Sequence, residues 1–234
     1  MNDSLLLEIS VETLGAAVAA ERGGAHRIEL CSDLSVGGVT PAADLMRKTR
    51  AAVKTPIFAM IRPRGGSFVY SDSELTQMRR DIELAKSCKI DGLVLGILHA
   101  DNTVDIERTR ELIKIAGPLP VTFHRAFDET PNVHEALESV IKTGATRILT
   151  SGGKPTAELG AASIADLVAA AGDRITILPG GGINTSNLAG IIRATHAHEF
   201  HSGLGTTLPY GQSSEAAFFS AVHELADLLC DGGH

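Results

Sequence analysis

The segment LPVTFHRAFDETPNVHEALESVIKTGATRILTS, residues 119–151, contains the repeating unit that decides the fold. Residues 119–125 form a short apolar run, and residues 147–151 form another. Between them, residues 132–144 have apolar positions at i, i+3 and i+4 and end at Gly144. Short apolar runs are typical of buried strands, and the intervening pattern is typical of an amphipathic helix that stops at glycine. The segment therefore predicts a strand, a helix and a second, parallel strand.

The same unit recurs along the whole chain of 234 residues. We expect strands at residues 5–10, 27–31, 57–62, 91–96, 119–125, 147–151, 175–180 and 199–203. Eight strands that alternate with helices predict one α/β domain over residues 1–234, a closed (β/α)8 TIM barrel whose lower interior is filled by Leu, Ile and Val. The alternative is a doubly wound open sheet, which usually has six strands.

Composition excludes several classes of function. The net charge is −7 and no cluster of basic residues is present, so we expect no nucleic-acid partner. No run of about 18 apolar residues exists and the first residues lack a basic signal-peptide region, so we expect no membrane association. The three cysteines, Cys31, Cys88 and Cys230, are far apart, which argues against a disulfide framework or a structural zinc site. These features predict a cytoplasmic protein.

Polar residues at the ends of the predicted strands keep one parity. Residues two apart on a strand share a face, and the polar residues pair in this way: Glu8 with Ser10, Glu29 with Cys31, Met60 with Arg62, Thr122 with His124, and Glu199 with His201. If these faces point inward, carboxylates, an arginine and histidines meet at the mouth of the barrel, where ligands bind. The alternative is a buried salt network that satisfies itself, for instance Glu29 paired with Arg62.

Four of these strand-end residues are candidates for catalysis: Glu29, Arg62, His124 and Asp128. Either Arg62 or Arg64 would clamp a phosphate or carboxylate, and either His124 or Glu29 would transfer a proton. Arg64 has the alternative of a solvated loop position. The residues expected to bind a small anionic ligand are Glu8, Arg64, Arg125, Ser151, Gly152, Gly180, Gly181, Gly182, His201 and Ser202.

A glycine-rich segment, LPGGGINTSNLAGI at residues 178–191, follows the seventh predicted strand. Its three glycines lead into a helix that should start near Thr185 or Asn187. Unobstructed backbone amides in front of a helix bind anions, and the loops after strands 7 and 8 are the usual phosphate site of a barrel. The alternative is that the glycines only permit a tight turn.

Two metal sites are conceivable. Cys31 and Met60 have soft sulfur atoms that would select Cu(I), although a lone cysteine on a strand is more often a small buried apolar residue. His124, His201 and the glutamates are instead ligand types that suit zinc or manganese. Because they come from separate strands without a metal-binding spacing, the sequence does not decide between these sites.

The segments RIELCSDLSVGGVTP (27–41), MIRPRGGSFVYS (60–71), VTFHRAFD (121–128), RILTSGG (147–153) and GGGI (180–183) together resemble the CutC family. The resemblance covers essentially the whole chain. It implies a TIM barrel, a cytoplasmic location, homo-oligomers and a role in copper homeostasis through Cu(I), with Cys31 among the ligands. Many members carry a cysteine in the first strand motif, where this chain reads Glu8-Ile9-Ser10, so the nearest soft partner of Cys31 is missing.

Three functions therefore remain open from the sequence. The first is copper handling or tolerance. The second is a lyase, isomerase or hydrolase that acts on a small phosphorylated or carboxylated metabolite, and the third is a sensor that binds such a metabolite without turnover.

For self-association, the final predicted helix (214–229) offers an apolar stripe with Phe218, Phe219 and Val222, which is either exposed or packed into the core.

Overall fold

In the computed structural model, which describes residues 5–208 and 214–231, eight parallel strands form the inner layer. They are β1 (Leu6–Val11), β2 (Arg27–Leu30), β3 (Ile57–Met60), β4 (Gly92–Leu95), β5 (Val121–Phe123), β6 (Arg147–Thr150), β7 (Thr176–Pro179) and β8 (Glu199–Ser202). The hydrogen-bonded order runs β7-β6-β5-β4-β3-β2-β1-β8, and the terminal strands β7 and β8 lie against each other to close the ring nearly completely. The TIM barrel is confirmed, and every predicted strand is found with its ends within two residues.

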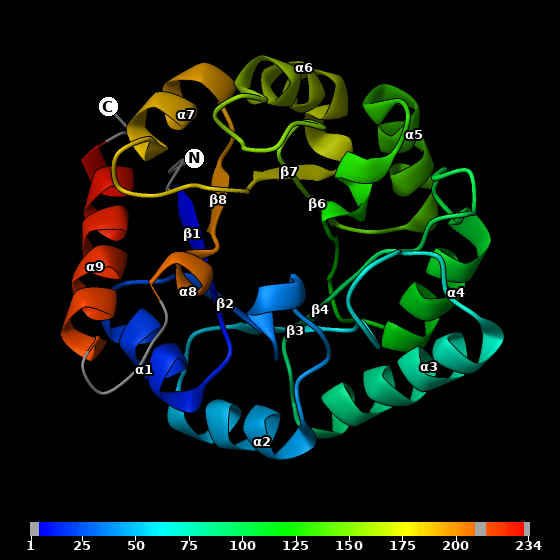
Figure 1. The fold of residues 1–234 in the computed structure, drawn as a ribbon, viewed down its shortest axis with the longest axis horizontal. Helices are drawn as coiled ribbons and strands as arrows, with labels where there is room; N and C mark the ends of the chain where they lie inside the picture. The colour runs from blue at the N-terminus through cyan, green and yellow to red at the C-terminus, as the bar shows by residue number, and fades with distance from the viewer. Residues whose placement is uncertain (1–4, 209–213, 232–234) are drawn as a thin grey trace.

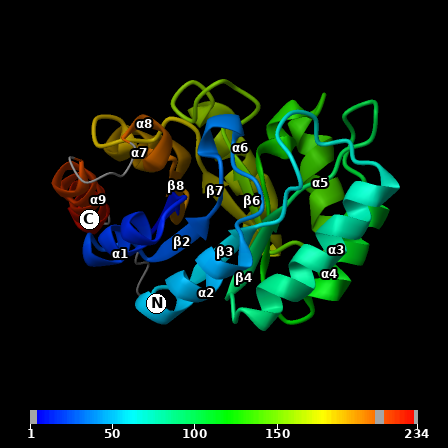
Figure 2. The same ribbon diagram turned by 60° about the horizontal axis from the view of Figure 1, so that its bottom comes forward.

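Helices surround this ring, as Figure 1 shows along the barrel and Figure 2 from a tilted view. They are α1 (Leu14–Arg22), α2 (Ala43–Ala52), α3 (Asp72–Ser87), α4 (Ile106–Ala116), α5 (Val133–Thr143), α6 (Ala161–Ala171), α7 (Leu188–Thr195), the short α8 (Leu204–Thr207) and α9 (Glu215–Asp231). Three 3₁₀ turns, Leu34–Val36, Arg125–Glu129 and Gly172–Arg174, interrupt the connections. Local signals fix the helix ends. Ser71 and Glu74 cap α3 reciprocally, and α5 ends at Gly144 with φ +86°.

The lower interior of the barrel differs from expectation because it holds charges instead of aliphatic residues. Arg27 and Arg147 both bind Glu199, with N···O distances of 2.7 and 2.6 Å. The two guanidinium carbons lie 5.0 and 5.3 Å from the ring centre of Phe58. Pairing with carboxylates and stacking on an aromatic ring offset the cost of burying these cations. The Leu, Ile and Val residues pack instead between the strands and the helices, for instance Leu7, Ile9 and Ile28.

Of the two alternatives for the apolar stripe of α9, the structure shows packing into the core, with Phe219 partly exposed. Phe218 and Val222 are fully buried, and α9 packs on α1. A Cβ atom at Gly23 would lie 2.7 Å from Val222, which shows how closely the two helices approach. This stripe therefore gives no support for self-association. Among the helices of the described residues, none has the length and apolar character that crossing a membrane requires.

Candidate functional site

A cavity of about 660 Å³ opens at the carboxyl ends of the strands. The strand-end residues that line it are Ser10, Glu29, Met60, Arg62, His124 and His201. All six have the parity that was predicted to point inward. The 3₁₀ turn Leu34–Val36 and the loops after β3, β6 and β7 complete the wall. The predicted parity therefore locates a single site at the mouth of the barrel.

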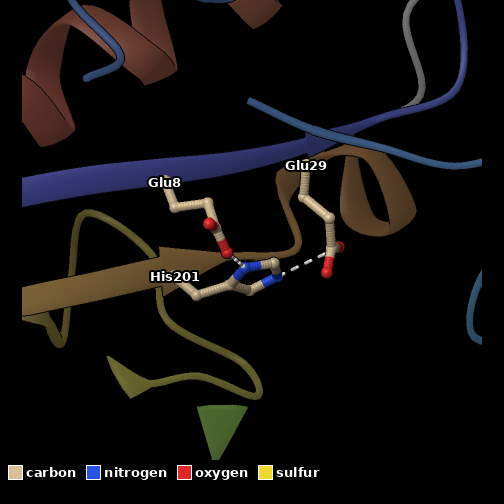
Figure 3. A group of neighbouring side chains, drawn as sticks. All are labelled: Glu8, Glu29 and His201. Carbon is tan, nitrogen blue, oxygen red and sulfur yellow. Dashed lines mark hydrogen bonds and ion pairs between the residues drawn. The ribbon is translucent and has the colours of Figure 1, made fainter. Parts of the chain in front are cut away.

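The centre of the site is His201, which lies between two glutamates (Figure 3). Glu8 and His201 are register partners on β1 and β8, and the Glu8 Oε1 atom is 2.7 Å from His201 Nδ1. On the other side of the imidazole ring, Glu29 Oε2 is 3.9 Å from His201 Nε2. Glu8 also pairs with Arg27. The fully buried Glu8 thus fixes the orientation of His201, and the opposite ring nitrogen faces Glu29.

The protonation of these groups follows from burial and pairing. Burial opposes ionisation of Glu8, but Arg27 and His201 overcome this effect and lower its pKa. Burial raises the pKa of Glu29. For His201, burial opposes the charge, but Glu29 and Glu8 together raise its pKa. The pKa values of Glu29 and His201 therefore both lie above their ordinary values, a perturbation that is typical of general acid–base groups.

His124 is held in one tautomer. It caps the 3₁₀ turn Arg125–Glu129, and its Nδ1 atom accepts a hydrogen bond from the Ala126 amide at 3.2 Å. Burial, together with the nearby Arg62 charge, lowers the pKa of His124 to about 3. The imidazole is neutral at physiological pH, and its proton sits on Nε2. The structure therefore favours Glu29 and His201 over His124 for proton transfer.

Arg62 lies in the cavity wall and joins two loops. Its guanidinium donates to the carbonyls of Val36 (2.9 Å), Gly38 (3.1 Å) and Gly66 (2.8 Å). The side chain also stacks on Phe68, with 4.6 Å from Cζ to the ring centre. No carboxylate of residues 5–208 or 214–231 forms an ion pair with it, so the conceivable Glu29–Arg62 pair is absent. Glu8 and Arg27 provide the buried ion pair instead.

Several residues of the predicted anion-binding set lie behind the cavity wall. Arg64 binds Glu74 at 2.5 Å and three carbonyls of its own loop, and therefore organises the loop before α3. Ser202 donates to the Ile183 carbonyl at 2.8 Å. A Cβ atom at Gly180 would lie 2.4 Å from Leu149, so this glycine serves packing. The members of the set that do not line the cavity are Glu8, Arg64, Ser151, Gly152, Gly180 and Ser202.

Asp128 lines the cavity, but its carboxylate is saturated by the loop after β6. It accepts hydrogen bonds from the Thr150 and Ser151 hydroxyls, from the Ser151 and Gly153 amides and from Arg125. With every oxygen engaged, Asp128 holds this loop in place and has no free lone pair for a substrate proton. The structure therefore assigns Asp128 a positioning role instead of the predicted catalytic one.

Two glycines of the segment after β7, Gly181 and Gly182, line the cavity. Gly181 has φ +104°, and a Cβ atom there would lie 3.2 Å from the Arg125 guanidinium carbon. Arg125, which also lines the cavity, therefore lies flat against Gly181. The following helix α7 begins at Leu188 with Asn187 as its cap, as expected. Glycine is required here both by the backbone conformation and by the position of Arg125.

The residues do not form a ready site for Cu(I). Cys31 and Met60 do share a small apolar cluster with Leu34, Phe58 and Val94. However, the Cys31 thiol is buried and lies 3.6 Å from Glu29 Oε2 as a donor. Burial and the Glu29 charge raise the thiol pKa well above its ordinary value, whereas a copper ligand must be a thiolate. Cys88 and Cys230 lie on the outer helices, away from the cavity.

Glu8, Glu29 and His201 offer ligand atoms within 4.8 Å of one another, a spacing compatible with a divalent cation. Figure 3 shows that the two carboxylates face opposite nitrogens of the imidazole ring. The ring therefore separates them, and this arrangement suits proton transfer better than a shared ion.

The sequence analysis did not include Arg27 and Arg147 among the site residues. Both share the inward parity of their strands, Arg27 with Glu29 and Arg147 with Leu149.

The fold and the site define a (β/α)8-barrel protein with a cavity at its mouth that is lined by polar side chains. A family model described as the CutC family matches residues 5–206. A Chromobacterium violaceum protein named as a CutC family protein is 45% identical over 94% of this chain and 91% of its own. The human copper homeostasis protein cutC homolog is 46% identical over 89% of this chain and 77% of its own. The chain belongs to the CutC family.

Solved structures agree with this assignment. CutC from Streptococcus agalactiae superimposes with a TM-score of 0.81 and 35% identity, over 85% of this chain and 98% of that one. Thiamine phosphate pyrophosphorylase from Pyrococcus furiosus superimposes with a TM-score of 0.66 over 99% of this chain and 98% of its own, at 16% identity. The second likeness shows the barrel fold alone.

Proposed function

We propose that this protein binds a small anionic metabolite in the barrel-mouth cavity and carries out proton transfer on it with Glu29 and His201. The observation that supports this function is a set of three buried polar atoms without hydrogen-bond partners: Glu29 Oε1, Arg62 Nε and His124 Nε2. All three residues line the same cavity. A buried polar atom without a partner costs about 1–3 kcal/mol, so a ligand that supplies acceptors and a donor here is stabilised.

Two guanidinium groups of the wall favour an anion, that of Arg62 and that of Arg125, of which the second also pairs with Asp128. Arg62 is only 4% exposed and has neutral carbonyls as its partners. Arg125 contributes a second guanidinium at the opposite loop. A guanidinium recognises carboxylate and phosphate through paired hydrogen bonds. The cavity volume of about 660 Å³ falls within the range of small-molecule sites.

The test is a binding screen by calorimetry with inorganic phosphate, oxalate, pyruvate and phosphoglycolate. We expect at least one anion to bind to the wild-type protein. Arg62→Lys should lower its affinity by about tenfold or more, because lysine keeps the positive charge but lacks the paired N–H groups of a guanidinium. The matched control is Arg174→Lys, whose Glu138 pair lies on the surface. An anion affinity that Arg62→Lys leaves unchanged would contradict the proposal.

Turnover distinguishes the enzyme from the sensor. In an enzyme, Glu29→Gln preserves most of the binding and removes proton transfer. A sensor binds the anion and turns over none of the compounds in the screen. The acid–base pair formed by Glu29 and His201, with Glu8 behind it, favours the enzyme.

Copper handling is the second candidate function, because the human and mouse relatives are named copper homeostasis proteins. The observation in its favour is the shared cluster of Cys31 and Met60. The test is an anaerobic Cu(I) competition titration of the reduced protein, with Cys31→Ser beside the control Cys88→Ser. Tight stoichiometric binding that only Cys31→Ser removes would support copper. Binding that is weak, or indifferent to Cys31, would contradict it.

A cytoplasmic location belongs to this proposal as well, and the three free thiols support it because reducing compartments keep cysteines unpaired. We also propose that the protein self-associates into homo-oligomers, which light scattering tests by measuring the molar mass in solution. A monomer at micromolar concentration would contradict self-association.

A further inference from the structure

His124 offers the cavity one hydrogen-bonding group of fixed type. Because Nδ1 accepts the Ala126 amide at 3.2 Å, that nitrogen carries no proton, and the neutral ring holds its proton on Nε2. The Nε2 atom is buried and has no partner, although the side chain lines the cavity. The residue is 3% exposed, so bulk water does not satisfy this donor.

Its surroundings keep the ring neutral. The Phe68 ring contacts both basic side chains, 4.8 Å from the His124 ring centre and 4.6 Å from the Arg62 guanidinium carbon. Arg62 is the charged group that faces His124, and it disfavours a second cation beside it. Figure 3 shows that Glu8 and Glu29 face His201 instead. A neutral imidazole donates a hydrogen bond without giving up its proton, and this is how it polarises a substrate carbonyl in proton-transfer enzymes.

The same cavity contains a base and a cation that complement this donor. Glu29 presents an unpartnered carboxylate oxygen, and Arg62 an unpartnered N–H group. A positioned base together with donors directed at one oxygen atom is the arrangement that stabilises an enolate. His201, oriented by Glu8, supplies a second acid–base group beside Glu29.

We infer that His124 is a catalytic hydrogen-bond donor to a substrate carbonyl oxygen, and that the substrate is a small α-hydroxy or α-keto compound with a carboxylate or phosphate group. The inference rests on the proposed function and names its chemistry. Glu29 takes the proton from the carbon next to the carbonyl. The C–H electron pair becomes the C=C bond, and the carbonyl π pair moves to oxygen, where His124 Nε2–H and Arg62 hold the enolate. A proton from Glu29 or His201 then returns to carbon, so that atoms and charge balance.

The first test is nitrogen NMR of the imidazole rings between pH 5 and 8, with His124→Gln to identify the signals. We expect His124 to show a protonated Nε2 and an unprotonated Nδ1 throughout. A ring that becomes doubly protonated within this range, or that carries its proton on Nδ1, would overturn the inference.

The second test compares planar enolate mimics with saturated anions of similar charge. The probes are oxalate against malonate, and phosphoglycolohydroxamate against glycerol 2-phosphate. We expect at least one planar mimic to bind about a hundredfold more tightly than its saturated counterpart. His124→Leu should remove this preference by lowering the affinity for the planar mimic far more than the affinity for the saturated anion. His124→Gln, which keeps an N–H donor, should restore part of the preference.

The results separate this inference from the function on which it rests. If saturated and planar anions bind equally well and both depend on Arg62, the anion site stands and the carbonyl inference fails. If the affinity for none of the anions depends on Arg62, the proposed function is wrong, and the inference that rests on it is wrong as well. A preference for planar mimics that survives in His124→Leu also overturns the assignment of His124.

Discussion

Glu8 and His201 face each other across β1 and β8, with 2.7 Å between Glu8 Oε1 and His201 Nδ1, although 193 residues separate them in the chain. The interaction joins strands from the two ends of the chain. It also turns the other imidazole nitrogen toward Glu29. The side-chain contact between β1 and β8 and the orientation of His201 toward Glu29 therefore depend on the same buried carboxylate.

Replacement of Glu8 by glutamine should destabilise the protein strongly. The change removes the negative charge that compensates Arg27 and His201 while both remain buried. Removal of one partner from a buried ion pair costs about 3–5 kcal/mol in the free energy of unfolding. Urea denaturation at pH 7 measures the effect. The control Glu138→Gln breaks the exposed pair with Arg174 and should cost far less stability. Equal losses in the two variants would contradict the role of Glu8.

Because His124 is buried in its neutral form, we expect the free energy of unfolding to fall in mild acid. Its pKa is about 3 in the folded protein against about 6.5 in the unfolded chain. Between these values the unfolded state binds one more proton at this residue, so the free energy of unfolding falls as the pH falls. The contribution approaches about 1.4 kcal/mol per pH unit well below pH 6.5.

Urea denaturation of wild type and His124→Gln at pH 7, 6 and 5 isolates this contribution, because the other histidines are common to both proteins. We expect the stability of the variant to fall less steeply with acid than that of wild type. Parallel pH profiles would show that His124 takes up its proton in the folded state as readily as in the unfolded chain.

Period-two alternation on strands is a local property, and it correctly placed Glu29, Arg62, His124 and His201 around one cavity. Arg62 and His124 still follow this alternation just past the ends of β3 and β5, but farther along the loops it no longer applies. Arg64 lies only two residues after Arg62, but its loop directs it to Glu74 on α3. Parity therefore predicts which side chains enter the barrel, while hydrogen bonds within the loops decide the direction of those that follow.

Charge states and close helix contacts depend on tertiary neighbours that the sequence does not reveal. The neutral state of His124 results from burial, from Arg62 and from the Ala126 amide. Asp128 is saturated by a loop that begins 22 residues later in the chain. The buried stripe on α9 depends on Gly23, which lets Val222 approach α1. In each case the partner comes from a turn or an element whose position only the folded barrel defines.

Glu29 should control the protonation of His201. Burial opposes the charge on His201, and the charge of Glu29 favours it, together with the hydrogen bond and the charge of Glu8. Glu29→Gln removes this carboxylate and should lower the pKa of His201, as measured from the imidazole Cε1 proton by NMR titration. As a control, Glu74→Gln changes a carboxylate that pairs with Arg64 outside the cavity. A His201 titration that Glu29→Gln leaves unchanged would mean that the two groups do not exchange a proton.

Gly181→Ala should weaken anion binding, whereas Gly190→Ala should not. Gly181 has φ +104°, a conformation that costs about 1–3 kcal/mol for a residue with a side chain, and the added methyl group would press on Arg125 and Ser151. Gly190 lies within α7, where an added Cβ meets nothing within 4 Å, so alanine there should stabilise the helix by up to about 1 kcal/mol.

Calorimetry with inorganic phosphate and urea denaturation, applied to both variants, separate the two effects. We expect the phosphate affinity of Gly181→Ala to fall by about tenfold or more, because displaced Arg125 no longer presents its charge to the cavity. Gly190→Ala should keep the affinity of wild type and unfold at a higher urea concentration. If Gly181→Ala binds phosphate as tightly as wild type, the anion does not contact this side of the cavity, and Arg62 alone supplies the cationic contact.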